Sequence, residues 1–70
     1  MEESTFKIEG DYIELIQLLK ATGLAESGGH AKAIVDAGIV FRNGEIETRK
    51  RAKLIIGDVV EVKNIKISLD

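Results

Sequence analysis

The sequence contains no cysteine, no proline and no tryptophan. Without cysteine it has no disulfides, no thiolate metal ligands and no cysteine nucleophile. Because the only aromatic residues are Phe6, Tyr12 and Phe41, we expect a core of leucine, isoleucine and valine that also takes in these three rings. Proline-rich linkers and low-complexity stretches are absent too, so we expect residues 1–70 to form a single domain.

Long apolar runs are also missing, and none approaches the roughly 20 residues that a membrane span needs. The first four residues, Met1 to Ser4, lack the basic and apolar regions of a signal peptide. We therefore expect a cytoplasmic protein that is monomeric and makes no contact with a membrane.

The residues of catalysis are scarce. His30 is the one histidine, and no histidine, aspartate and glutamate cluster has metal-ligand spacing. Ser27 lies three residues before His30, but a serine–histidine pair also needs an orienting group and an oxyanion hole, for which the sequence offers no candidate. We expect no catalytic residue, no metal and no cofactor, and interpret the chain as a non-enzyme.

Two helices are predicted from apolar periodicity and capping residues. Asp11 with Glu14 has the spacing of a capping box and predicts a helix over 12–22. Ser27 is the expected N-cap of a second helix over 28–37, which Gly38 ends. The short stretch between them predicts a helix-turn-helix pair.

Strands are predicted where the apolar period changes to two. Asn43-Gly44 between strands at 39–42 and 45–48 is a strong hairpin signal, because both turn positions need positive φ. Further strands are expected at 5–9, 59–62 and 65–69, the last of these beside 5–9, and residues 53–56 lead to a second turn at Gly57-Asp58. The predicted class is α+β, with two packed N-terminal helices against a small, mainly antiparallel sheet.

The charges are unevenly distributed along the chain. The formal net charge is −2, but residues 30–53 hold six basic and three acidic side chains, whereas residues 1–29 hold two basic and six acidic ones. The segment Arg49-Lys50-Arg51-Ala52-Lys53 contains no acid at all. Such a run is either a solvated loop or a phosphate-binding surface, and the absence of interleaved acids favours phosphate binding.

Other residues extend this candidate surface. Arg42 and Asn43 at the hairpin can join the run, and Lys32 on the second helix is a weaker addition. Gly28 and Gly29 after Ser27 either let the helices turn closely or offer backbone amides to an anion. Since no set of exposed aromatics is expected, contact through phosphates and shape is favoured over stacking on splayed bases.

The order of these motifs resembles the S4-like RNA-binding domain, and is similar to the small free-standing bacterial members of the YbcJ/YaaA type. The segments that carry the resemblance are 15–20, 26–35, 38–45, 48–54 and 57–60, within a core motif of about 12–62. Residues 5–9 and 65–69 flank it as added strands. The common family pattern has an arginine after the serine where this chain has Gly28, which moves weight onto Arg49, Lys50 and Arg51.

The resemblance implies the αL-type RNA-binding motif and binding of structured RNA, such as ribosomal or transfer RNA, without catalysis. The alternative is a protein-interaction module that docks on a ribosome-associated or RNA-processing factor, which the acidic first third of the chain suggests. The expected RNA-binding residues are Ser27, Gly28, Lys32, Arg42, Asn43, Gly44, Arg49, Lys50, Arg51 and Lys53.

Overall fold

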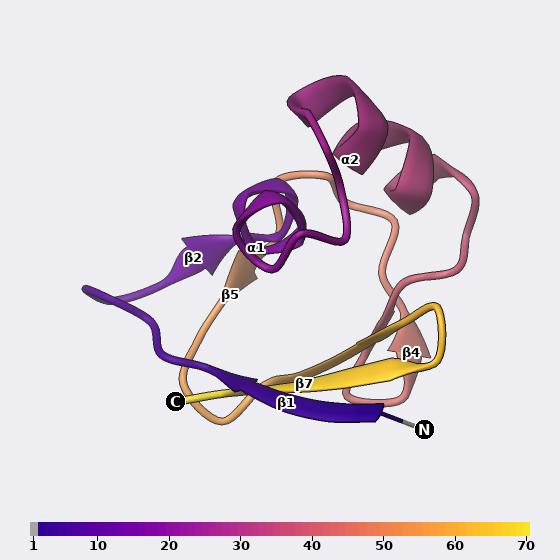
Figure 1. Cartoon of the computed structure of the whole chain (residues 1–70). Helices are drawn as coiled ribbons and strands as arrows, with labels where there is room; N and C mark the ends of the chain where they lie inside the picture. Colours follow the sequence, from indigo (N-terminus) through magenta and orange to yellow (C-terminus); the bar gives the residue numbers. More distant parts are fainter. Residues whose placement is uncertain (1) are drawn as a thin grey trace.

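Two helices lie over one face of a five-stranded sheet in the computed structural model, which describes residues 2–70 (Figure 1). A two-stranded sheet lies beside the first helix. The α+β class predicted from the sequence is therefore confirmed. The elements are β1 (Glu2–Phe6), β2 (Ile13–Glu14), α1 (Leu15–Ala21), α2 (Gly28–Asp36), β3 (Phe41–Arg42), β4 (Glu45–Ile46), β5 (Lys53–Leu54), β6 (Val59–Val62) and β7 (Ile65–Leu69).

The helices are not the N-terminal part of the fold, and the prediction was wrong on this point. Both β1 and β2 precede α1, while β3 to β7 follow α2. The strand predicted over 5–9 lies earlier, because its pairing with β7 begins at Glu2 and ends at Phe6. Ile8 follows the strand and is still buried, with its N–H donating to the Asp70 carbonyl at 2.8 Å.

The five-stranded sheet is mixed, with the strand order β1-β7-β6-β3-β4. Within residues 2–70, β7–β6, β6–β3 and β3–β4 are antiparallel, as the prediction of a mainly antiparallel sheet requires. The pairing of β1 with β7 is also confirmed, but it is parallel. Because nearly the whole chain separates these two strands, no short hairpin imposes an antiparallel direction on them.

Aliphatic side chains form the core between the helices and the sheet, as predicted. Both helices and the inner faces of the strands supply them: Leu15, Leu18, Leu19, Ala31, Ile34, Val35, Val60, Val62, Ile67 and Leu69. Of the three aromatic rings expected in this core, Phe6 packs against it and the other two do not. Phe6 is only partly buried, whereas Tyr12 is 44% exposed and Phe41 is 37% exposed.

Helix α1 begins at Leu15, three residues later than predicted. Ile13 and Glu14 form β2, which pairs with Leu54 and Lys53 of β5 and so keeps them extended. Neither Asp11 nor Glu14 opens the helix as a capping box: Glu14 occupies the cap position, and no side-chain cap hydrogen bond forms there in the described chain. Backbone carbonyls of the segment before β5 accept the first helical N–H groups instead.

Helix α2 forms where the sequence predicts it, ending at Asp36. The hydroxyl of Ser27 accepts a hydrogen bond from the His30 N–H at 3.1 Å, which confirms the predicted cap. In return, His30 Nδ1 accepts the Glu26 N–H at 3.0 Å. The only histidine is therefore part of the cap of α2.

The predicted hairpin is confirmed, with shorter strands than expected. Asn43 and Gly44 have φ angles of 52° and 87°, and they join β3 to β4 with Arg42 opposite Glu45. A second turn with positive φ, at Lys63 (51°) and Asn64 (67°), joins β6 to β7. Both turns thus have the positive φ at two central residues that suits tightly twisted hairpins.

Candidate nucleic-acid interface

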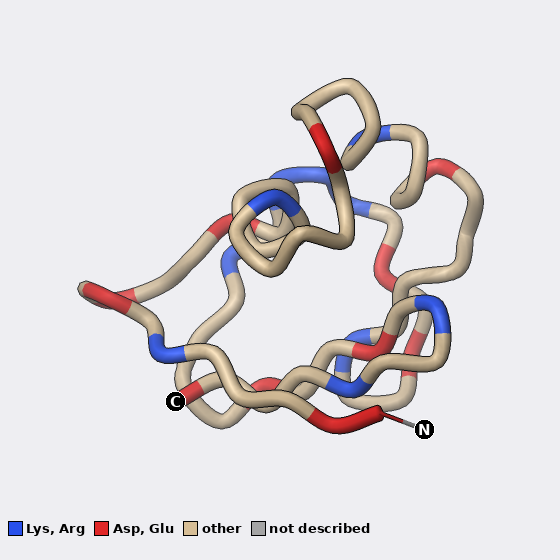
Figure 2. Tube along the Cα trace, viewed as in Figure 1, with Lys and Arg blue, Asp and Glu red and all other residues tan. Residues whose placement is uncertain are grey.

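The segment Arg49–Lys53, here called the basic strip, begins in the connection after β4 and ends at the first residue of β5. It passes beside α1 and contains the longest blue stretch of the trace in Figure 2. Its backbone is held by α1: the Leu15 N–H donates to the Ala52 carbonyl at 2.9 Å, and the Ile16 N–H donates to the Lys50 carbonyl at 3.3 Å. The side chain of Ala52 is buried. The strip is therefore anchored through its backbone.

The basic side chains of the strip point outward. The Arg49, Lys50 and Arg51 side chains are 71%, 42% and 83% exposed, respectively, and Lys53 is also exposed. Together with Arg42, most of the strip lines a surface pocket. The structure therefore brings together the residues predicted from 49 to 53.

Acidic residues meet three of these side chains, one from the same connection and two from other elements. Arg49 donates to Glu47 through Nε at 3.0 Å and Nη2 at 3.1 Å. Lys50 Nζ lies 3.2 Å from an oxygen of Asp36 on α2, and Arg51 lies 4.0 Å from Glu14. The fold thus reduces the local positive charge that the sequence alone indicates. The pairs of Lys50 and Arg51 are largely exposed and contribute only about 0–1 kcal/mol, so an incoming phosphate can replace them. The Glu47 side chain that holds Arg49, in contrast, is only 9% exposed.

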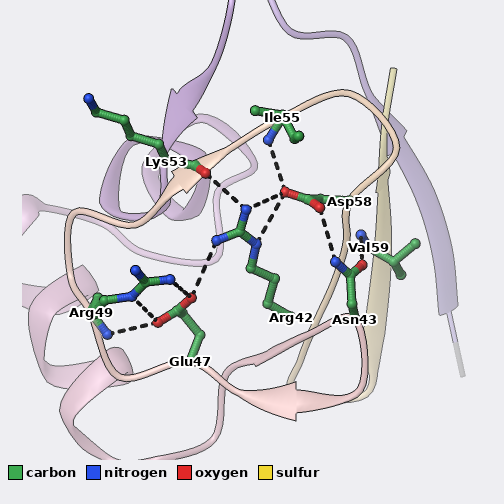
Figure 3. A network of polar contacts seen from close by, with 8 residues as sticks. All are labelled: Arg42, Asn43, Glu47, Arg49, Lys53, Ile55, Asp58 and Val59. Carbon is green, nitrogen blue, oxygen red and sulfur yellow. Dashed lines mark hydrogen bonds and ion pairs between the residues drawn. The ribbon is translucent and has the colours of Figure 1, made fainter.

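Arg42 holds the base of the strip, and Figure 3 shows its guanidinium between two carboxylates. It donates to Asp58 through Nε at 3.1 Å and Nη2 at 2.7 Å, and its Nη1 lies 3.5 Å from Glu47. Nη2 also donates to the Lys53 carbonyl at 3.0 Å. With a side chain only 21% exposed, Arg42 lies next to the strip as predicted, but its donors are used inside the protein.

Asn43 ties the hairpin to β6. Its Nδ2 donates to Asp58 at 3.0 Å, and its Oδ1 accepts the Val59 N–H at 2.8 Å (Figure 3). Asp58 also accepts the Ile55 N–H at 2.9 Å. Asn43 is therefore engaged within the fold, whereas Gly44 beside it is exposed at the turn.

The pKa values of the two buried carboxylates reflect this network. Hydrogen bonds from the Arg49 side chain are the main reason that the pKa of Glu47 falls to about 2, against an opposing effect of burial. The same pair raises the pKa of Arg49. Burial raises the pKa of Asp58, but hydrogen bonds from Ile55, Asn43 and Arg42 outweigh it and lower the pKa overall. Both carboxylates are therefore ionised near neutral pH.

The predicted residues on α2 lie at different distances from the strip. The contact of Lys50 with Asp36 places the end of α2 beside the strip, and Lys32 lies one turn earlier on that face of the helix. Ser27 and Gly28 are at the opposite end, about 12 Å away along the axis at 1.5 Å per residue. The structure therefore brings Lys32 near the strip and leaves Ser27 and Gly28 farther off.

Three residues at this surface were not predicted from the sequence. Asp58 accepts hydrogen bonds from Arg42, and Glu47 accepts them from Arg49. The sequence features that could have indicated these two acids are the position of Asp58 directly after Gly57 and of Glu47 two residues before Arg49. Tyr12 was assigned to the core, but its exposed ring has Lys53 Nζ 5.0 Å from its centroid. Such a distance is typical of a cation–π contact.

No group of three or more histidine, cysteine, aspartate or glutamate side chains among residues 2–70 could hold a metal ion. Neither helix in that range is long and apolar enough to cross a membrane.

Comparisons with known proteins connect the sequence to a family. The sequence profile described as S4 domain matches residues 6–69. The chain is 45% identical over 49 residues to "Putative RNA-binding protein YbcJ" of Escherichia coli (strain K12), a match that covers 70% of each protein. The values are the same for "Uncharacterized protein YbcJ" of Shigella flexneri. Identity to "Probable ribosome maturation protein RlbA" of Bacillus subtilis (strain 168) is 39% over 56 residues, 80% of this chain and 79% of that protein.

Proposed function

Because the chain belongs to the S4 domain family, as its motif order predicted, we propose that it binds structured RNA in the cytoplasm, mainly through phosphates and without catalysis. The observation that carries this proposal is the basic strip, whose backbone is fixed to α1 while its side chains project outward. A fixed array of outward cations needs little reordering when it meets a phosphate backbone. Of the two predicted ligands, ribosomal and transfer RNA, the names of the relatives, "Putative RNA-binding protein YbcJ" and "Probable ribosome maturation protein RlbA", favour ribosomal RNA.

The proposal gives different tasks to the predicted residues. Arg49, Lys50, Arg51 and Lys53 contact phosphates, with Lys32 beside them. The hairpin residues Arg42, Asn43 and Gly44 hold the strip in place, and Ser27 and Gly28 meet the RNA, if at all, through backbone amides at the start of α2. Residues 1–70 act as one binding domain in which the helix pair, hairpin and strip form the αL-type motif.

Arg49 is well placed to bind phosphate while keeping its partner. A guanidinium has five N–H donors, and Glu47 accepts from Nε and Nη2 only. The remaining donors of Arg49 face away from this pair and are available to a phosphate oxygen. Glu47 therefore orients Arg49, and RNA binding does not require their separation.

The test is the salt dependence of binding to a blunt-ended RNA duplex. Each lost phosphate contact reduces the slope of log K against log salt by about 0.7–0.9. The variant Lys50→Gln/Arg51→Gln should therefore flatten the slope by about 1.4–1.8 and weaken binding. Lys63→Gln/Lys66→Gln is the matched control, because it removes the same net charge from β7 and the turn before it. Equal weakening in both variants, or none in the first, would refute the proposal.

A second candidate function is docking on a ribosome-associated or RNA-processing protein. The observation that favours it is an apolar patch on the sheet: Phe41 lies opposite Ile46, and Ile39, Phe41 and Ile46 are 40%, 37% and 56% exposed. A partner that survives ribonuclease treatment in a pull-down, and that is lost with Ile46→Lys, would support this reading. Loss of all partners on ribonuclease treatment would leave RNA as the ligand.

A further inference from the structure

Tyr12 lines a surface pocket that contains no residue of the basic strip. The ring is 44% exposed and lines a pocket of about 440 Å³ together with Phe6, Lys7, Glu9, Ile13 and Gln17. The pocket is an open hollow of about the same size as two other surface pockets, and what distinguishes it from them is the aromatic ring. We call this hollow the Tyr12 pocket.

The Tyr12 pocket adjoins the basic strip. Lys53 Nζ lies 5.0 Å from the centroid of the Tyr12 ring, and Lys53 also lines the pocket of the strip with Arg49 and Arg51. The link is built into the fold, because β2, directly after Tyr12, pairs with β5, which begins at Lys53. An RNA backbone bound along the strip would therefore pass next to the Tyr12 ring.

The side chains of the Tyr12 pocket match the chemistry of a nucleobase. The Tyr12 ring offers a flat aromatic surface, and Phe6 and Ile13 supply apolar contact. The amide of Gln17 both donates and accepts hydrogen bonds, as the edges of bases require. Exposed bases that stack on aromatic side chains are a common mode of RNA recognition.

We propose that the Tyr12 pocket receives one unpaired base of an RNA whose phosphates lie on the basic strip. The ligand class is thus a duplex interrupted by an unpaired nucleotide, with Lys53 between the base and its phosphate. This inference rests on the proposed function, because the strip supplies most of the affinity. The sequence led us to expect contact through phosphates and shape alone. The proposed mode adds one stacking contact between a base and the Tyr12 ring.

Affinity for two RNAs tests the proposal on the unmodified protein. The probes are a blunt-ended duplex and the same duplex with a single bulged adenosine. Since stacking of a base is worth roughly 1–3 kcal/mol, the bulged RNA should bind about 5- to 140-fold more tightly. Equal affinity for the two RNAs would overturn the inference and leave the proposed function standing. Failure of both RNAs to bind would reject both.

Tyrosine fluorescence gives a second readout that needs no variant. Tyr12 is the only tyrosine and there is no tryptophan, so intrinsic emission reports on this ring alone. Stacking of the bulged base should quench the emission at saturation much more than the blunt duplex does. Equal quenching by the two RNAs would count against a base in the pocket.

Two substitutions then separate stacking from packing. Tyr12→Leu keeps an apolar side chain without an aromatic face and should bind both RNAs with the affinity of the blunt duplex. Tyr12→Phe keeps the ring and should retain the preference for the bulged RNA. Unchanged binding of the blunt duplex shows that each variant is folded. A preference that persists in Tyr12→Leu would contradict the proposal.

Discussion

Replacing Asp58 by alanine should destabilise the fold more than replacing any exposed acid of the basic surface. Asp58 is 7% exposed and accepts hydrogen bonds from Arg42, Asn43 and the Ile55 N–H. Its removal leaves the Arg42 guanidinium, which is mostly buried, without its shortest partner at 2.7 Å. The turn before β6 and the hairpin at Asn43 lose a common attachment point.

The loss in the free energy of unfolding depends on the contacts that Arg42 keeps in the Asp58→Ala variant. Breaking a buried ion pair from one side costs about 3–5 kcal/mol. Arg42 is 21% exposed and keeps Glu47 at 3.5 Å and the Lys53 carbonyl at 3.0 Å, which places the expected loss at about 2–4 kcal/mol. At roughly 0.05–0.15 kcal/mol per residue, that is a large part of the stability of so small a domain.

Urea denaturation followed by circular dichroism measures this loss. The matched control is Asp36→Ala, because Asp36 pairs with Lys50 at 3.2 Å but its side chain is 61% exposed. Its loss should be about 0–1 kcal/mol. In thermal unfolding, Asp58→Ala should lower the midpoint by roughly 10–25 °C. A loss below 1 kcal/mol for Asp58→Ala, equal to that of the control, would refute the view that this network holds the strip.

Three further predictions concern stability. The pKa of Glu47 is lowered to about 2, so its pairing with Arg49 stabilises the fold above the ordinary pKa of 4.5 and is lost as the pH falls from about 4.5 to 2. Since Arg49 is largely exposed and solvent screens the pair, wild type should lose more stability than Glu47→Gln across that range in urea titrations, and parallel curves would contradict this. Ser27→Ala should cost about 0.5–2 kcal/mol through loss of the cap, with Ser27→Thr close to wild type in thermal melts; a Thr variant as unstable as Ala would argue against the cap. Gly44→Ala should cost about 1–2 kcal/mol because φ is +87°, whereas Gly28→Ala, in a helix and facing open space, should be neutral or stabilising by calorimetry; equal effects at both glycines would remove the backbone argument.

The sequence predicted those elements whose signals are local. The cap at Ser27 and the turn at Asn43-Gly44 each depend on residues within one turn of the chain, and both form as expected. The membership in the S4 domain family was likewise predictable, because the order of short motifs survives differences in the residues between them.

The start of α1 was not predictable from local signals. Asp11 and Glu14 have the spacing of a capping box, but the pairing of Ile13 with Leu54 holds this stretch extended. Burial of an apolar strand pair outweighs a cap that contributes about 1 kcal/mol. A contact between residues so distant in the sequence leaves no sign in either segment alone.

At the candidate site too, features that depend on neighbouring residues were predictable and contacts between distant segments were not. The basic strip and its exposure were predicted, because a run of cations cannot be buried. Its acidic neighbours were not, because Glu14 and Asp36 come from other elements and meet the strip only in the fold. The exposure of the Tyr12 ring was not predictable either. Aromatic residues are usually buried in proteins, and no feature of the sequence indicates that Tyr12 is exposed.

The parallel pairing of β1 with β7 has a consequence for how the chain folds during synthesis. Glu2 pairs with Ile65, so β1 leaves the ribosome long before its partner exists. Closing so long a loop carries an entropic penalty and slows folding relative to local pairings. The helix pair and the 43–44 hairpin can form early, whereas Ile67 and Leu69 complete the core only when β7 arrives. A nascent or truncated chain that lacks β7 should therefore expose core valine and isoleucine side chains, which would make it a substrate for chaperones.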